Sequence, residues 1–466
     1  MDRLFLFVSI ITYVSVFVEH SIIIVTISNR RIKMKDKMSG VIKEMYYDDL
    51  WKRLCRNSTS EVLSPAAIER ISKRSYKEGI IFNIFKESTV VSKKYLENLI
   101  KENSRCQYDE LYCKGVRLTE PYFDSLFHNM NLKEIKSDNK VTYAMVVKRS
   151  DIRTFPTEDR VFKTPHEYAI DRFMESSVYI GEPCIIYLMS SDKKWYFCRT
   201  YNYCGWIKKD NLAIGDKDVI EAYFKSEKFI MVTGGRLLLG VNPINNELSN
   251  IVLDMGTRLA LAQDLNEKDI VDDMYCGGNY IVKYPLSKDG RLYFKRLLIP
   301  YSMDVHQGYL KCTRANIISQ IFKFQGERYG WGGDFQGRDC ASLMVDTFKT
   351  MGLYLPRNTG QQCQAAIGTT VHFSTENASE KLEIIKGARP GTLLYLKGHV
   401  VMKVGDYNGD TYIIHDTIGT NIKNESGEMT YIPANGVTVS LLKDIFTSGG
   451  NSYIKEIVAM KDLVGK

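Results

Sequence analysis

The residues around Cys340 are those expected around a nucleophilic cysteine. Apolar residues follow it at three-and-four spacing, at Leu343, Met344, Phe348 and Met351. This spacing predicts a helix with one buried face, and Asp339 has the side chain of its N-cap. Unpaired N–H groups and the positive end of the helix dipole favour a thiolate in the first turn. A buried structural thiol is the alternative for such a cysteine.

A cysteine nucleophile needs a base, and the chain has only 7 histidines. Those that follow Cys340 are His372, His399 and His415. His399 opens the run HVVMKV, and His415 closes the run TYIIH after the turn residues Asn408-Gly409. Both runs are short, β-branched and bounded by turn residues, which predicts a hairpin.

The register of this hairpin decides whether the two imidazoles can meet. A two-residue loop would pair Met402 with His415 and put the histidines on opposite faces of the sheet. A three-residue loop over 407–409 would pair Val401 with His415 and put His399 diagonal to it on the same face. In that register His399 would take the thiol proton, and His415 would orient His399.

Five segments around these residues resemble the catalytic domain of the NlpC family, papain-like cysteine peptidases of bacterial cell walls. They are YGWGG from Tyr329, RDC at Cys340, LPRNTGQQ, GHVVMKVG and IIHD. The resemblance covers about residues 311–466. It implies that Cys340 is the nucleophile, His399 the general base and His415 the third polar residue. Tyr329 would lie beside the oxyanion site, and no metal or organic cofactor is implied.

The same resemblance implies hydrolysis of the γ-D-glutamyl bond to a diamino acid in peptidoglycan stem peptides. The predicted substrate-binding residues are Asp339, Arg357, Asn358, Thr359 and Glu182. Relatives often carry an aspartate at the position of Asn358, where it holds the free amine of the stem. Asparagine has no charge, so we expect a carboxylate of the preceding domain, Glu182, to supply it. Alternatively, Asn358 only caps the turn after Pro356.

Length and composition predict about three globular domains for the 466 residues, with 44% hydrophobic and 25% charged residues. The net charge of +8 is dispersed, which gives little support for a nucleic-acid partner. The 10 cysteines lack metal-ligand spacing. We expect free, mostly buried thiols, the alternative being the disulfides Cys106–Cys113 and Cys198–Cys204.

The predicted fold is α+β, with the cysteine-bearing helix packed on an antiparallel sheet. Residues 45–135 are predicted as a helical stabilising region, 141–215 as a first SH3-like barrel, 219–305 as a second one, and 311–466 as the peptidase domain. By resemblance, the first barrel closes one end of the cleft. That arrangement would restrict a monomeric enzyme to short, free stem peptides.

Residues 1–38 form a hydrophobic leader or a membrane anchor. Leu4 to Val18 is uniformly apolar, and the run Ile22 to Ile27 extends it towards the ~20 residues of a membrane span. Basic residues follow it between 30 and 37, and the positive-inside rule would then keep the protein in the cytoplasm. We expect a cell-envelope or secreted protein, or a cytoplasmic one if translation starts further along the chain.

Two other functions remain open from the sequence. An acyltransferase or amidase on the same papain-like fold would resolve the acyl-cysteine with an acceptor other than water. A non-catalytic wall-binding SH3 protein would carry a silent peptidase domain, although Cys340, His399 and His415 are all present.

Overall fold

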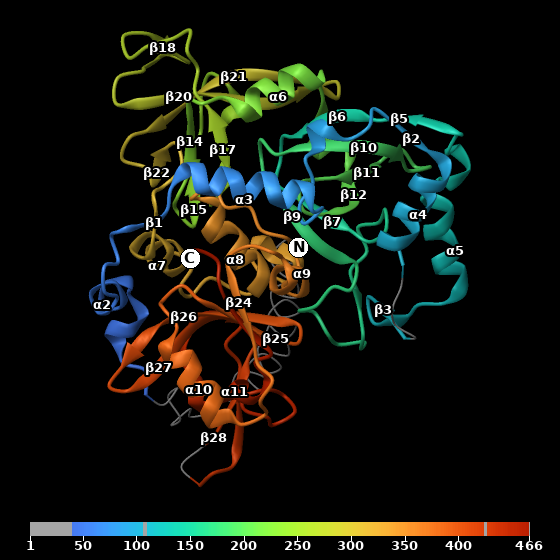
Figure 1. Ribbon diagram of the computed structural model, residues 1–466. Coiled ribbons are helices and arrows are strands. Elements are labelled where there is room, and N and C mark those ends of the chain that lie inside the picture. The colour runs from blue at the N-terminus through green and yellow to red at the C-terminus, as the bar shows by residue number, and fades with distance from the viewer. Residues whose placement is uncertain (1–39, 106–109, 424–425, 466) are drawn as a thin grey trace, which may run out of the picture.

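The computed structural model describes residues 40–105, 110–423 and 426–465. The predicted leader at 1–38 lies outside the described residues, as does Cys106. None of the described helices has the length and apolar character needed to cross a bilayer. The chain folds as mixed α and β structure, with the orange and red C-terminal strands below two strand-rich regions in Figure 1.

The C-terminal region is built on a six-stranded sheet with the order β24-β32-β25-β26-β27-β30. The strands are β24 (Thr369–His372), β32 (Ala459–Asp462), β25 (Leu393–Leu396), β26 (His399–Tyr407), β27 (Asp410–Thr417) and β30 (Gly436–Leu441). Helices α7 (Arg314–Phe322) and α8 (Cys340–Lys349) share one apolar core with this sheet. Helices α10 (Ala378–Gly387) and α11 (Tyr453–Glu456) share a second core with it. The cysteine-bearing helix therefore packs on an antiparallel sheet, as predicted.

A β-bulge sets the register of the β26–β27 hairpin. The turn has two residues, because Tyr407 pairs with Asp410, but the register shifts between Lys403 and Gly405. Beyond the shift Met402 pairs with Ile414, and continuing this register brings 401 opposite 415. Residue 401 thus lies opposite His415, as predicted for a three-residue loop, but a β-bulge after a two-residue turn produces this pairing. A bulge depends on what packs against the strand, which local sequence does not reveal.

Trp51 packs against this bulge from the N-terminal region. Its helix is α2 (Asp48–Leu54), and its side chain is fully buried. A Cβ atom added to Gly405 would lie 3.0 Å from the Trp51 ring, and that ring lies 5.4 Å from the ring of Tyr412. The indole N–H donates to the carbonyl of Met45 at 2.9 Å. The start of the chain therefore supports the strand pair that carries both histidines.

The predicted stabilising region divides between two cores. Residues around Trp51 belong to the core of the C-terminal region, and β1 (Glu61–Leu63) pairs with β23 (Cys312–Thr313). Helices α4 (Lys93–Asn103) and α5 (Glu120–Asn129) pack instead on the first barrel. Helix α3 (Pro65–Lys77), which Ser64 caps, crosses between the two in Figure 1.

The first barrel region shares one sheet with the region that follows it. The nine strands run in the order β20-β21-β13-β6-β10-β11-β12-β7-β9. They are β20 (Asn279–Lys288), β21 (Arg291–Pro300), β13 (Leu212–Ile214), β6 (Thr142–Val146), β10 (Pro183–Met189), β11 (Trp195–Arg199), β12 (Cys204–Lys208), β7 (Ser150–Arg153) and β9 (Met174–Val178).

The second region has its own apolar core. Its short strands are β14 (Phe229–Val232), β17 (Arg258–Ala260), β22 (Val305–Gln307), β15 (Arg236–Leu238) and β16 (Val252–Asp254), and helix α6 (Lys217–Lys225) precedes them. Because one long hairpin, β20–β21, continues the sheet of the first barrel, the two regions are joined through backbone as well as side chains.

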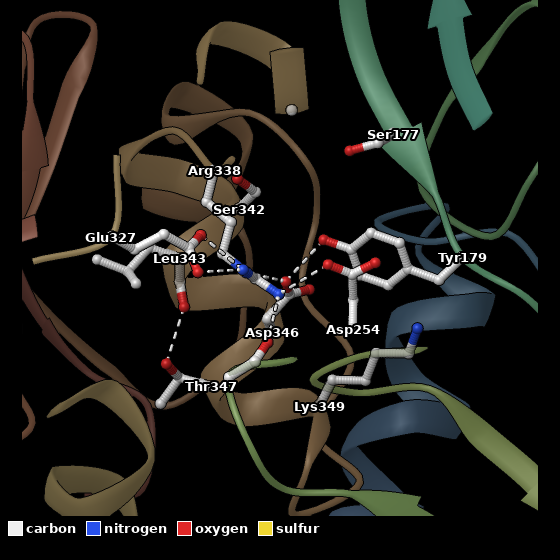
Figure 2. A network of polar contacts seen from close by, with 12 residues as sticks. Ser177, Tyr179, Asp254, Glu327, Arg338, Ser342, Leu343, Asp346, Thr347 and Lys349 are labelled. Atoms are coloured by element: carbon white, nitrogen blue, oxygen red, sulfur yellow. Dashed lines mark hydrogen bonds and ion pairs between the residues drawn. The ribbon is translucent and has the colours of Figure 1, made fainter. Parts of the chain in front are cut away.

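Arg338 joins the second strand-rich region to the helix that bears Cys340 (Figure 2). Its guanidinium is fully buried and donates to Asp346 of α8 at 2.6 Å and to Glu327 at 2.6 Å. It also lies 3.4 Å from Asp254 of β16, and Tyr179 of the first barrel donates to Asp346 at 2.8 Å. Arg338 therefore anchors the start of α8 to the second region, and Asp346 joins the same helix to the first barrel through Tyr179.

Replacing Arg338 by methionine leaves the buried carboxylates of Asp254 and Asp346, and the half-buried one of Glu327, without their shared cation. Breaking a buried ion pair from one side costs about 3–5 kcal/mol, so we expect a loss of that order in the free energy of unfolding. Urea unfolding of the variant measures it. Arg328→Met is the matched control because Arg328 is exposed, and its change should stay within about 0.5 kcal/mol. Equal effects of the two substitutions would contradict the role of the buried cation.

Candidate active site

Helix α8 begins at Cys340 because Asp339 caps it. The Asp339 carboxylate accepts hydrogen bonds from the N–H groups of Ala341 and Ser342 at 3.1 and 2.9 Å. The Ser342 hydroxyl in turn accepts from the Asp339 N–H, which completes a capping box. The N–H of Cys340 is not used by this cap.

The glycine-rich loop before α8 packs against the first barrel. Gly332 and Gly333 have φ of 65° and 101°, and a Cβ on Gly333 would lie 1.9 Å from the Ser177 hydroxyl of β9. The Trp331 indole N–H donates to the carbonyl of Met174, also on β9, at 3.1 Å. The segment that comes close to these glycines is the edge strand of the barrel.

The Cys340 thiol lies against the backbone of Val400 in β26, the residue that follows His399. Cys340 is 7% exposed. Burial raises the pKa of the thiol to about 12, the adjacent Asp339 carboxylate adds to the rise, and the backbone N–H of Val400 opposes it. Burial also lowers the pKa of His399 to about 4. The substrate-free site therefore favours a neutral thiol and a neutral imidazole, which corrects the expectation of a resting thiolate.

The two histidines form a hydrogen-bonded chain that ends at Ser440. His399 Nε2 and His415 Nδ1 are 3.1 Å apart, and His415 Nε2 is 3.1 Å from the Ser440 hydroxyl oxygen. If His399 is to accept a proton at Nδ1, its Nε2 must donate to His415, whose Nε2–H then donates to Ser440. One set of tautomers thus satisfies every ring nitrogen and leaves a base free for the thiol.

Tyr329 and Asp416 complete the polar surroundings of the thiol. Burial raises the pKa of the Tyr329 hydroxyl, as do the nearby Asp339 and Cys340, so the phenol keeps its proton as an oxyanion donor must. Asp416 follows His415, is fully buried, and neither of its carboxylate oxygens has a hydrogen-bond partner among the described residues. Burial raises the pKa of this carboxyl well above its ordinary value. Sequence reasoning missed both Asp416 and Ser440.

The predicted substrate-binding residues fall into separate places. Arg357 holds Asp339 through two hydrogen bonds of 3.1 and 2.6 Å, and both side chains are buried. Asn358 is exposed and is the N-cap of α9 (Thr359–Gln364), as the turn-capping alternative predicted, and Thr359 is partly exposed at its first position. Glu182 is not in the cleft.

Glu182 is paired with the far end of the helix that bears the thiol. It accepts a hydrogen bond from Lys349 at 2.5 Å. Lys349 is the last residue of α8 and Cys340 the first, which puts them about 13 Å apart at 1.5 Å per residue. The expectation that Glu182 supplies charge beside Asn358 is therefore wrong.

Tyr203 links a different carboxylate of the first barrel, Glu175, to Asn358. Glu175 of β9 accepts hydrogen bonds from the hydroxyls of Tyr203 and Thr154, the latter at 2.6 Å. Burial raises the pKa of the Tyr203 hydroxyl, as does Glu175, while a hydrogen bond with Asn358 opposes the rise. Glu175, Tyr203 and Asn358 thus lie in one group at the cleft. The motif reading had no signal for Glu175, because the fold alone brings β9 to the loop of Trp331.

Metal ligation has no support among residues 40–105, 110–423 and 426–465, where no group of three or more His, Cys, Asp or Glu could hold an ion. The described cysteines are free thiols, and those at 113 and 363 are partly exposed while the others are buried. The alternative disulfide Cys198–Cys204 is not formed, since both thiols are free, and the other alternative involves Cys106, which lies outside the described residues.

Comparison with known proteins identifies two domains in the chain. Residues 326–440 match the model of the NlpC/P60 family, and residues 160–208 match the SH3 domain of the SH3b1 type. No curated protein sequence matches the chain. The predicted resemblance to the NlpC family and the predicted α+β fold are confirmed. The second SH3-like barrel, the domain boundaries and the site residues stay predictions.

Two solved structures resemble the chain. An NlpC/P60 endopeptidase from Photobacterium damselae subsp. piscicida has 18% identity and a TM-score of 0.68, over 89% of this chain and 95% of that one. An NlpC/P60 family protein from Bacillus cereus ATCC 10987 has 16% identity and a TM-score of 0.45, over 69% of this chain and 100% of that one. The first likeness shows that the fold extends over most of the chain.

The rate of Cys340 alkylation by iodoacetamide should still be rising above pH 8.5 in the free protein. The physical reason is that burial raises the thiol pKa to about 12 and holds His399 neutral, so no resting ion pair supplies thiolate at pH 7. Mass spectrometry of the Cys340 peptide separates its signal from the partly exposed Cys113 and Cys363. A plateau reached below pH 8 would show a thiolate–imidazolium pair and contradict the neutral site.

Proposed function

We propose that this protein is a cysteine endopeptidase that hydrolyses the γ-D-glutamyl bond to a diamino acid in peptidoglycan stem peptides. The observation that carries the proposal is that Cys340, at the N-terminus of α8, lies against the backbone of Val400 in β26, next to the hydrogen-bonded pair His399–His415, inside the NlpC/P60 match. The SH3 domain that flanks the cleft supports a peptidoglycan substrate. An acyltransferase of the same fold would differ only in the acceptor, and no contact of the described residues favours it.

The proposed reaction uses the neutral pair directly. The Cys340 sulfur attacks the γ-carbonyl carbon while its proton passes to Nδ1 of His399. The Cys340 N–H and the Tyr329 hydroxyl donate to the oxyanion that forms. His399 then gives the proton to the leaving amine of the diamino acid. Water hydrolyses the acyl-cysteine in the second half of the reaction, with His399 as base, and the thiol is restored.

Glu175 supports recognition of a free N-terminal amine on the stem. It lies with Tyr203 beside Asn358, where the sequence analysis expected a missing negative charge. A charged acceptor binds an ammonium through a hydrogen bond roughly twice as strong as a neutral one. We therefore assign to Glu175 the role that we had predicted for Glu182. A short, unblocked stem peptide fits this arrangement, and we propose with it a location in the cell envelope or outside the cell.

Cys340→Ala should abolish release of the diamino acid from defined muropeptides, because no other nucleophile adjoins His399. The expected loss in kcat is on the order of 10⁴-fold or more, whereas His415→Ala should lose less because it orients the base. Mass spectrometry of the products identifies the bond that is cut, and circular dichroism shows that the variants are folded. Full turnover by Cys340→Ala, or transfer of the acyl group to an added amine in preference to water, would contradict the proposal.

Glu175→Gln should lower kcat/KM for a free stem peptide by about tenfold, which corresponds to a lost charge-assisted hydrogen bond. It should leave kcat/KM for the N-acetylated peptide unchanged. Asn358→Asp adds a carboxylate and should raise the free-to-acetylated ratio, while Glu182→Gln is the matched control outside the cleft. If Glu175→Gln left the ratio of kcat/KM for the free and the N-acetylated peptide unaltered, the first barrel would not bind the amine.

A further inference from the structure

Tyr453 contacts both histidines of the site, although no motif in the sequence points to it. It is the first residue of α11. Its ring centroid lies 5.9 Å from the imidazole of His399 and 5.9 Å from that of His415, with interplanar angles of 79° and 89°. The imidazole centroids are 5.4 Å apart. Three rings therefore pack around the hydrogen bond that joins the two histidines.

Core residues and two threonines hold the side chain of Tyr453 in place. Tyr453 is 6% exposed and belongs to the apolar core on the face of the sheet that α10 and α11 cover. Burial raises the pKa of its hydroxyl, and the side chains of Thr420 and Thr417, which hydrogen-bond to it, oppose that rise. Ser452 caps α11 through the N–H of Lys455. The two threonines thus hold the Tyr453 hydroxyl, and the capped start of α11 holds its backbone.

His399 needs such support because it is the partly exposed member of the pair. His415 is fully buried, whereas His399 opens its strand at the rim of the site. The χ2 torsion of a histidine is broad, so little intrinsic preference keeps Nδ1 turned to the thiol and Nε2 to His415. Water at the rim would compete for both nitrogens. An aromatic ring that packs on the two histidines excludes this water and restricts the rotation of the His399 imidazole.

We propose that Tyr453 is a positioning residue: its ring packs on both imidazoles, keeps water from their hydrogen bond and holds His399 with Nδ1 facing the thiol. The role in turnover rests on the proposed peptidase function. The effect on the histidine pair does not, since it follows from the packing of three rings. The phenol oxygen is secondary, because the contact with the imidazoles is made by the ring.

The test compares Tyr453→Phe, which keeps the ring, with Tyr453→Leu, which removes it. Leu442→Ala is the matched control, since Leu442 is fully buried in the same apolar core. Full-length protein labelled with ¹³C-histidine is titrated by NMR, without substrate. We expect the His399 pKa to stay at about 4, the value that burial gives it, in wild type, Tyr453→Phe and Leu442→Ala. In Tyr453→Leu water reaches the ring, so the pKa should rise by about one unit or more towards 6.5.

A second readout uses stem-peptide hydrolysis. Tyr453→Leu should lower kcat by about tenfold with KM within about twofold, because a misplaced base affects the chemical step. Tyr453→Phe should restore kcat to within about threefold of wild type. Tyr453→Met gives the same comparison if the leucine variant does not fold. An unchanged His399 titration in a folded Tyr453→Leu or Tyr453→Met protein overturns the proposal. A shifted titration in a protein that cleaves no stem peptide upholds it and refutes the peptidase function instead.

Discussion

The carboxylate of Asp339 is the group on which the site depends. It ends the loop, begins α8 and sets the position of Cys340. It also accepts the Gly332 N–H at 3.0 Å and binds Arg357, whose Nε donates to Ser176 of the first barrel at 2.8 Å. Burial alone would raise the pKa of this carboxyl, but Arg357 and the N–H donors outweigh burial and lower it. Its contribution to stability is therefore present at neutral pH and is lost as the pH falls through the lowered pKa.

Arg338 and Asp339 each connect the site to a different neighbouring region. Asp339 reaches the first barrel through Arg357, and Arg338 reaches the second region through Asp254 and the Gly235 carbonyl. Buried ion pairs are weak sources of net stability, because desolvation offsets much of the attraction. They do penalise every arrangement in which a charge loses its partner. The wall of the cleft and the helix that bears the thiol are thus held in one relative position, as recognition of a short substrate requires.

Sequence reasoning succeeded where local rules decide the structure. The N-cap at Asp339, the helix after it and the turn between β26 and β27 follow from residues within a few positions of one another. It failed where tertiary packing decides. The bulge at Gly405 forms against Trp51, more than 300 residues away in sequence. Glu182 has the right charge but lies at the wrong end of α8, and Glu175 reaches the cleft only because β9 is an edge strand.

The cap also explains why the helix terminus does not acidify the thiol. A free helix N-terminus offers unpaired N–H groups and a positive potential, which is why the sequence predicted a thiolate. At Cys340 the N–H groups of Ala341 and Ser342 are bound by the Asp339 carboxylate, whose negative charge adds to the rise in the thiol pKa. The N–H of Cys340 is left for the substrate. The terminus therefore acts on the charge that develops on the substrate oxygen and gives little help to the resting sulfur. Such a site forms its anion only when a carbonyl carbon is in place to share it.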